Sequence, residues 1–311
     1  MKKHVWAVFL LTAWSCVRAQ GKDSIFSCRV GADVTVTIDL PANMNAHTPA
    51  ILVFFALPNG NSTAQTMGKK INSGDDWHYD IQHIRAQTRF LRSRRPFQNL
   101  IVAYLENDFK SWPLWKSKQP GYQRLVQHIA DTVRALVPAV QNVYFNGHSG
   151  GGRFIFSFLD GVDSIPAYVQ RISFLDSIYG YDSTYTRKLV TWLEGNPKAS
   201  LNVFAYNDSV ALYQGKPVVS ATGGTWYRSH LMLRDLSAVF NFRETRHDSM
   251  IVYKSSDGRI QFWLKTNPDR KIFHTQQVEL NGFIHSILCG TRFDERRYRY
   301  YAKRAYSHFV E

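Results

Sequence analysis

The sequence predicts an α/β protein with a mostly parallel central sheet flanked by helices. Two continuous apolar runs, at residues 50–56 and 99–106, suit strands that are buried on both faces, as in a parallel sheet. Strand-like and helix-like segments then alternate along the rest of the chain, as βα units require. The 311 residues are 44% hydrophobic, which is enough for one large domain with a sizeable core.

The first 19 residues are predicted to be a secretory signal peptide. Lys2 and Lys3 precede an apolar stretch at residues 5–14, and residues 17–19 offer a cleavage site. The stretch is too short to span a bilayer, and no other segment is suited to it. The alternative is a buried first helix or strand. We expect an exported, soluble protein with a single domain over residues 20–311.

The formal net charge is +14, and removal of residues 1–19 takes away three basic residues and no acidic one, which leaves +11. The basic surplus forms no long run, although residues 296–304 are locally basic. A nucleic-acid-binding protein would carry a recognition motif beside such a patch, and the sequence has none. We expect a last helix there that packs Tyr298 and Phe309 inward. The charge favours acidic polymers or an anionic envelope surface as partners.

Two cysteines, Cys28 and Cys289, would remain after cleavage. In an oxidising compartment they can form one disulfide. The alternative is a pair of buried free thiols, because unpaired cysteine is among the most buried residue types.

The expected elements follow in order. The first two strands, at 24–30 and 33–40, meet at a turn around Gly31 and form an antiparallel pair. Further strands are expected at 50–56, 99–106, 142–145, 171–176, 201–208, 250–254, 259–264 and 271–278, and helices at 123–137, 153–159, 185–194 and 230–236. A turn at 256–258 joins two of the late strands as a hairpin. The sequence shows neither repeats nor a linker.

One motif carries chemistry: Gly147-His148-Ser149-Gly150-Gly151 fits the G-x-S-x-G pattern. In that turn a tight strand-to-helix bend pushes the serine hydroxyl outward. The flanking glycines have a steric purpose, because a side chain there would collide with the neighbouring strand or helix. The expected strand at 142–145 and the helix that starts at 153 supply the required context.

With this context the chain resembles the α/β-hydrolase superfamily over nearly its whole mature length. "GHSGGG" after "VYF" is the strongest feature, and the order Ser149, Asp208, His285 matches the family order of nucleophile, acid and base. The segment "FFALPNGN…DDWHYDIQHIRAQTRFLR" resembles exported bacterial members. The resemblance implies a serine hydrolase that cleaves an ester, or alternatively an amide, through an acyl-enzyme and without a cofactor.

The resemblance assigns the base to His285, since it lies near the chain end after the last expected strand. His274, inside that strand, is expected to be a packed or edge residue. Asp208 is favoured as the acid over Asp176, because the usual family position follows the later strand. Either aspartate can instead be a helix cap or turn residue. The long gap from Asp208 to His285 is expected to be filled by the hairpin.

An acyl-transfer site also needs donors for an oxyanion. The backbone N–H of Gly150 is expected to be one. The second is expected from Leu57 or Asn59, because Pro58 between them has no N–H. The family's usual His-Gly pair is absent, and the Asn59 side chain is an alternative donor.

The cluster Asp75, Asp76, His78, Asp80 and His83 raises the question of a metal site. Helical metal sites use histidines three or four residues apart, whereas these two are five apart. We therefore expect no metal, and a loop near the pocket with Trp77 and Tyr79 as wall residues.

The sequence thus predicts a secreted or periplasmic serine hydrolase. A bacterial source is favoured, because glycans on the sequons at Asn61 and Asn207 would obstruct the expected site. The alternative is a non-catalytic ligand-binding protein of the cell envelope with the same fold. The complete set of triad candidates favours the enzyme.

Overall fold

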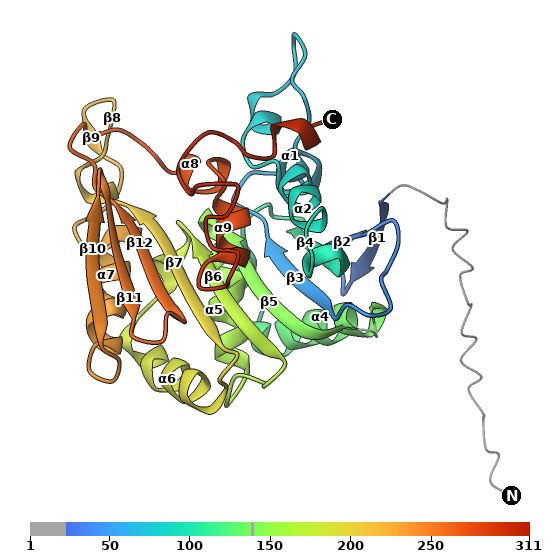
Figure 1. Cartoon of the computed structure of the whole chain (residues 1–311), viewed down its shortest axis with the longest axis horizontal. Helices are drawn as coiled ribbons and strands as arrows, with labels where there is room; N and C mark the ends of the chain where they lie inside the picture. Colours follow the sequence, from blue (N-terminus) through green and yellow to red (C-terminus); the bar gives the residue numbers. More distant parts are fainter. Residues whose placement is uncertain (1–22, 138–139) are drawn as a thin grey trace, which may run out of the picture.

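The apolar runs of the sequence form the centre of one large sheet. The computed structural model describes residues 23–137 and 140–311, so the predicted signal peptide and Cys16 lie outside the described residues. The sheet has the strand order β1-β2-β4-β3-β5-β6-β7-β12-β11-β10 (Figure 1). Its strands are β1 (Ser24–Val30), β2 (Val34–Leu40), β3 (Ala50–Ala56), β4 (Leu100–Asn107), β5 (Val140–His148), β6 (Val169–Leu175), β7 (Ser200–Tyr206), β10 (Phe242–His247), β11 (Met250–Ser255) and β12 (Ile260–Lys265).

The strands from β4 to β12 in this order are parallel to one another, and antiparallel strands close both ends of the sheet. Every residue of β3 is buried, as its continuous apolar run predicted, and every residue of β7 is buried as well. The outermost strand β10 differs, because Arg243 to His247 are all exposed. The mostly parallel sheet confirms the predicted fold class.

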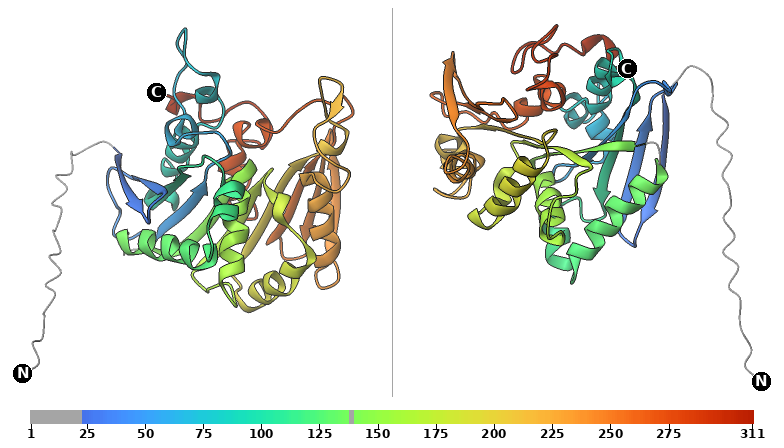
Figure 2. Two further views of the ribbon diagram at one scale, coloured as in Figure 1. Left: turned by 180° about the vertical axis from the view of Figure 1, so that it is seen from behind. Right: turned by 60° about the horizontal axis from the view of Figure 1, so that its bottom comes forward.

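Helices cover both faces of the sheet (Figure 2). They are α1 (Thr63–Met67), α2 (Ile84–Arg92), α3 (Trp112–Lys118), α4 (Tyr122–Leu136), α5 (Gly152–Gly161), α6 (Thr186–Gly195), α7 (Thr225–Leu236), α8 (Gln276–Glu279) and α9 (Gly282–Leu288). One core cluster joins the sheet to α3, α4, α5, α6 and α7. A second core cluster, on the other face, joins it to α2, α9 and the C-terminal tyrosines. No helix in the described ranges is long and apolar enough to cross a bilayer.

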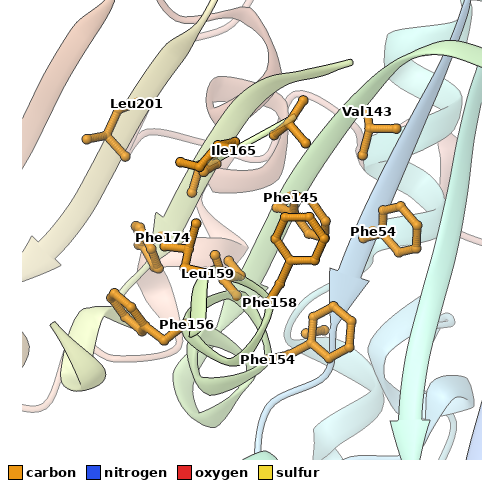
Figure 3. Close-up of a cluster of buried hydrophobic side chains, with 14 of the residues drawn as sticks. Phe54, Val143, Phe145, Phe154, Phe156, Phe158, Leu159, Ile165, Phe174 and Leu201 are labelled. Carbon is orange, nitrogen blue, oxygen red and sulfur yellow. The ribbon is translucent and has the colours of Figure 1, made fainter. Parts of the chain in front are cut away.

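Aromatic packing fixes α5, the helix that follows the serine turn (Figure 3). Phe145 of β5 stacks on Phe54 of β3, with 5.1 Å between ring centroids, and lies 4.5 Å from Phe158 of α5. Phe156 stacks on Phe174 of β6 at 4.9 Å. All these rings are buried. Burying each large apolar side chain contributes on the order of 1.5–3 kcal/mol, so α5 is anchored firmly to the sheet.

Three local predictions were wrong. Residues 271–278 form no strand; they run as a loop into α8, because both edges of β12 are already paired with β7 and β11. His285, expected in a loop, lies in α9. The basic C-terminal segment forms turns rather than a last helix, although Tyr298 is buried as expected.

The two cysteines are free thiols, but only Cys289 is buried, so the second alternative holds for that residue alone. Cys28 on β1 packs against the first core cluster, whereas Cys289, directly after α9, belongs to the second. The sheet therefore lies between them. Cys289 donates to Asn202 Oδ1 at 3.0 Å, and burial raises its pKa to about 12.

Candidate active site

Ser149 lies in the tight strand-to-helix turn that the motif predicted. β5 ends at His148, residues 149–151 form a 3₁₀ turn, and α5 begins at Gly152. Ser149 has φ +54°, in the left-handed region that non-glycine residues seldom adopt. A Cβ on Gly147 would lie 2.9 Å from the carbonyl carbon of Gly151, and one on Gly151 would collide with the Ala56 carbonyl. The glycines are therefore required by close packing, as the sequence indicated.

Asp176 ends the neighbouring strand. His148 of β5 is paired with Leu175 of β6, so Ser149 and Asp176 are the first residues beyond two adjacent strand ends. Asp176 also has a positive φ, +45°, and its carboxylate is fully buried. Oδ2 accepts from His274 Nδ1 at 2.5 Å, and Oδ1 accepts from the Thr225 hydroxyl.

His274 comes from the loop between β12 and α8. Its Nδ1 is engaged by Asp176, which leaves Nε2 as the nitrogen available to a reacting group. His148, next to Ser149, donates from Nε2 to the His274 carbonyl at 3.2 Å, and the two rings lie 4.6 Å apart. Burial keeps the pKa of His148 well below its usual range, so its ring is neutral near pH 7. Within the described residues, no hydrogen bond joins Ser149 Oγ to His274.

The structure does not bring His285 to Ser149. His285 is fully buried on the sheet face opposite α5, where its ring stacks on Tyr300 and meets Trp263 edge-on. Its Nδ1 bonds the Tyr298 hydroxyl at 2.9 Å, and burial lowers its pKa well below the usual range. A buried, neutral histidine in this setting is a core residue.

His274 is the histidine that sequence reasoning set aside. The segment that contains it has the pattern of a strand, which predicts a packed or edge histidine rather than a base. A better signal was its place in the chain, because it is the first histidine after the strand that pairs with β7. That strand closes the parallel part of the sheet, and its carboxyl end lies on the same edge as Ser149.

Asp208 caps a helix instead of holding the base. Its carboxylate accepts from the backbone N–H groups of Thr225 at 2.7 Å and Trp226 at 3.2 Å, at the start of α7. Burial, and next the nearby charge of Asp176, raise its pKa to about 6. The Thr225 hydroxyl lies 3.2 Å from Asp208 and also donates to Asp176. Asp208 thus contributes to the site by fixing Thr225.

The candidate oxyanion donors are reduced to Gly150 and Asn59. The Leu57 N–H is engaged by the Leu105 carbonyl at 3.2 Å, which removes it from consideration. The Asn59 side chain lies directly against Gly150, too close for any Cβ there. Its amide therefore lies beside the Gly150 backbone, where an oxyanion from attack by Ser149 is expected.

A cavity of about 250 Å³ opens at Ser149. It is lined by Asn59, Pro113, Ser149, Gly150, Arg153, Ser177, Tyr179 and Gly180. Tyr179 also meets the His274 ring edge-on, 6.4 Å between centroids, so His274 lies just behind this wall. Larger hollows lie beside α6 and α2, but they contain none of the reactive side chains. Trp77 and Tyr79, expected at the wall, do not line the cavity.

The cluster at 75–83 forms local pairs. Asp75 binds Lys69 at 2.6 Å, Asp76 binds His78 at 2.5 Å, and Asp80 binds His83 at 2.8 Å. Arg304 adds a second partner for Asp80 at 2.6 Å. These contacts tie the segment between α1 and α2 together and to the C-terminal segment.

No protein-family model matches the chain, and no curated protein matches it significantly. Solved structures do match. A thermostable esterase superimposes with a TM-score of 0.50 at 14% identity, over 85% of this chain and 61% of that one. A siderophore hydrolase from Aspergillus nidulans matches over 92% of this chain and 99% of its own, with a TM-score of 0.47 at 12% identity. A feruloyl esterase module from Clostridium thermocellum, complexed with sinapinate, matches over 90% of both chains, with a TM-score of 0.49 at 12% identity.

The chain spans less than two thirds of the length of the thermostable esterase. At this level of identity the similarity concerns the fold. The strand order, the turn at Ser149 and the superposition on that esterase agree: the chain has the α/β-hydrolase fold.

Proposed function

We propose that the protein is a serine hydrolase that cleaves carboxylic esters through an acyl-enzyme, with Ser149 as nucleophile, His274 as base and Asp176 as orienting acid. The observation that carries the proposal is the His274–Asp176 hydrogen bond beside the Ser149 turn. His274 thus takes the place of His285 as the proposed base. Asp176, the alternative acid of the sequence analysis, takes the place of Asp208. Amide cleavage by the same route is the less favoured reaction.

In this mechanism His274 Nε2 removes the Ser149 hydroxyl proton as Oγ attacks the ester carbonyl. The Gly150 N–H and the Asn59 amide stabilise the oxyanion. When the intermediate collapses, His274 returns the proton to the departing alcohol. A water molecule then releases the acyl group by the reverse sequence. Asp176 keeps the proton on Nδ1 and stabilises the imidazolium that forms.

Ser149 and His274 do not need to be hydrogen-bonded before the substrate binds, because catalytic contacts are often loose in free enzymes. The anchored elements limit how far they can drift. Ser149 is held by the packed α5, and His274 by contacts to Asp176 and His148.

A fluorophosphonate probe tests the proposal. We expect it to label Ser149 in the wild type, and Ser149→Ala to abolish labelling while the thermal melting curve is unchanged. A p-nitrophenyl ester panel should then show turnover that the variant lacks. Labelling of the variant at the wild-type level would refute Ser149 as nucleophile. No labelling and no turnover would favour the ligand-binding alternative.

We also propose, from the predicted signal peptide, that the protein acts outside the cytoplasm. Mass analysis of the same protein recovered from a secreting host should give a chain that begins at residue 20. An intact N-terminus would contradict export by this route.

A further inference from the structure

Arg153 brings a positive charge to the Ser149 cavity. Its side chain lines the cavity together with Ser149. In the described parts of the chain, its guanidinium has neither a hydrogen bond nor an ion pair, and the cavity lining contains no carboxylate.

The helix geometry explains how Arg153 reaches the cavity. It lies four residues after Ser149, in the first turn of α5. Side chains on a helix tilt towards the N-terminus, so the long arginine side chain extends back over the turn that holds Ser149.

The guanidinium of Arg153 lies close to the backbone of Gly180. A Cβ on Gly180 would lie 2.9 Å from Arg153 Nη1, so the charged end lies directly against the Gly180 backbone. Gly180 and its neighbour Tyr179 both line the cavity. The positive charge therefore lies at the cavity wall.

We propose that the substrate is an ester that carries a carboxylate, and that Arg153 binds this carboxylate in the Ser149 cavity. This inference rests on the proposed function and adds the substrate class to it. A guanidinium presents a planar fork of N–H donors that matches a carboxylate. The guanidinium and the Ser149 hydroxyl line the same small cavity, of about 250 Å³, so a carboxylate close to the ester group can reach Arg153.

The test compares matched esters. One pair carries the charge on the acyl side: p-nitrophenyl hydrogen adipate against its neutral methyl ester. The other pair carries it on the leaving group: 3-carboxyphenyl butyrate against its methyl ester. We expect the wild type to prefer the anionic member of at least one pair in kcat/KM by roughly ten- to hundredfold. Added salt should reduce the preference.

Substitutions assign the preference to Arg153. Arg153→Gln should abolish it, and Arg153→Lys should retain part of it because the charge remains. Arg243→Gln is the matched control, since it removes the same charge from the exposed edge strand β10, which four other strands separate from β5. It should keep the wild-type ratio. Circular dichroism verifies that each variant is folded.

The outcomes separate the two proposals. Turnover of the neutral esters without a preference for either anionic one would overturn the substrate class and leave the serine hydrolase standing. A preference that persists in Arg153→Gln would also overturn it. Absence of both turnover and probe labelling would overturn the proposed function and this inference together.

Discussion

His274 and His285 are close in the sequence but lie in environments that suit different tasks. His274 is partly exposed, with one ring nitrogen bonded to a carboxylate and the other available. His285 is enclosed by aromatic rings and bonded to a tyrosine hydroxyl. A base must exchange a proton with the substrate, whereas a core histidine must stay neutral.

The proposed roles predict opposite defects. His274→Gln should lower kcat by about 10⁴-fold or more, because it removes the proton acceptor. His285→Gln should keep kcat per folded molecule but lower the free energy of unfolding by about 1–3 kcal/mol, because it leaves the buried Tyr298 hydroxyl poorly paired. Ester kinetics measure kcat, and urea unfolding measures the free energy of unfolding, for both variants. The reverse pattern would restore His285 as the base.

At the scale of elements, the start of α7 is where Asp176 and Asp208 both bind the backbone or side chain of the helix, so the charge of Asp208 affects the stability of the fold. Asp208 caps this helix with a pKa raised to about 6, above the ordinary 3.8. A carboxyl group whose pKa is raised by folding binds protons more tightly in the native state. Its stabilising contribution is therefore present below pH 3.8 and lost as the pH rises through 6.

Asp208→Asn should remove this part of the pH dependence. In the wild type we expect the free energy of unfolding to fall between pH 4 and 6.5 by the Asp208 contribution, and in the variant this fall should be smaller. The variant should also lose about 1 kcal/mol of capping at pH 7, offset in part by relief of the buried charge. Ester turnover should persist in Asp208→Asn and fall by about 10⁴-fold in Asp176→Asn. Urea unfolding at several pH values between 4 and 6.5 measures how steeply the free energy of unfolding depends on pH. The same pH dependence in the wild type and in Asp208→Asn would contradict the raised pKa of Asp208.

The sequence predicted the elements that periodicity controls. Buried strands such as β3 and the Ser149 turn depend on local patterns, and both are present. The loop around His274 was not predicted, because its own residues carry no information about the pairing of β12 with both β7 and β11. The choice between Asp176 and Asp208 also depended on contacts with α7 and His274, which are distant in the chain. Long-range pairing therefore decided the features that sequence reasoning missed.

At the scale of the whole molecule, the sheet separates the two thiols, which should differ in reactivity. Cys28 is partly exposed near one end, whereas Cys289 is fully buried. We expect iodoacetamide to modify Cys28 slowly in the native protein and Cys289 only after unfolding. Mass analysis without reductant measures how many thiols are modified before and after unfolding. A mass lower by two hydrogens, with no modification after unfolding, would show a disulfide instead.

The exposed strand β10 has a consequence for how copies of the protein meet. The outer edge of a sheet has unpaired N–H and C=O groups that can template a strand from another molecule. Here Arg243, Glu244 and Arg246 line the strand, and two of them pair with each other at 2.5 Å. Charged side chains on an edge oppose such addition, because a second strand would have to desolvate them. The strand that closes the sheet therefore also protects the molecule from aggregation.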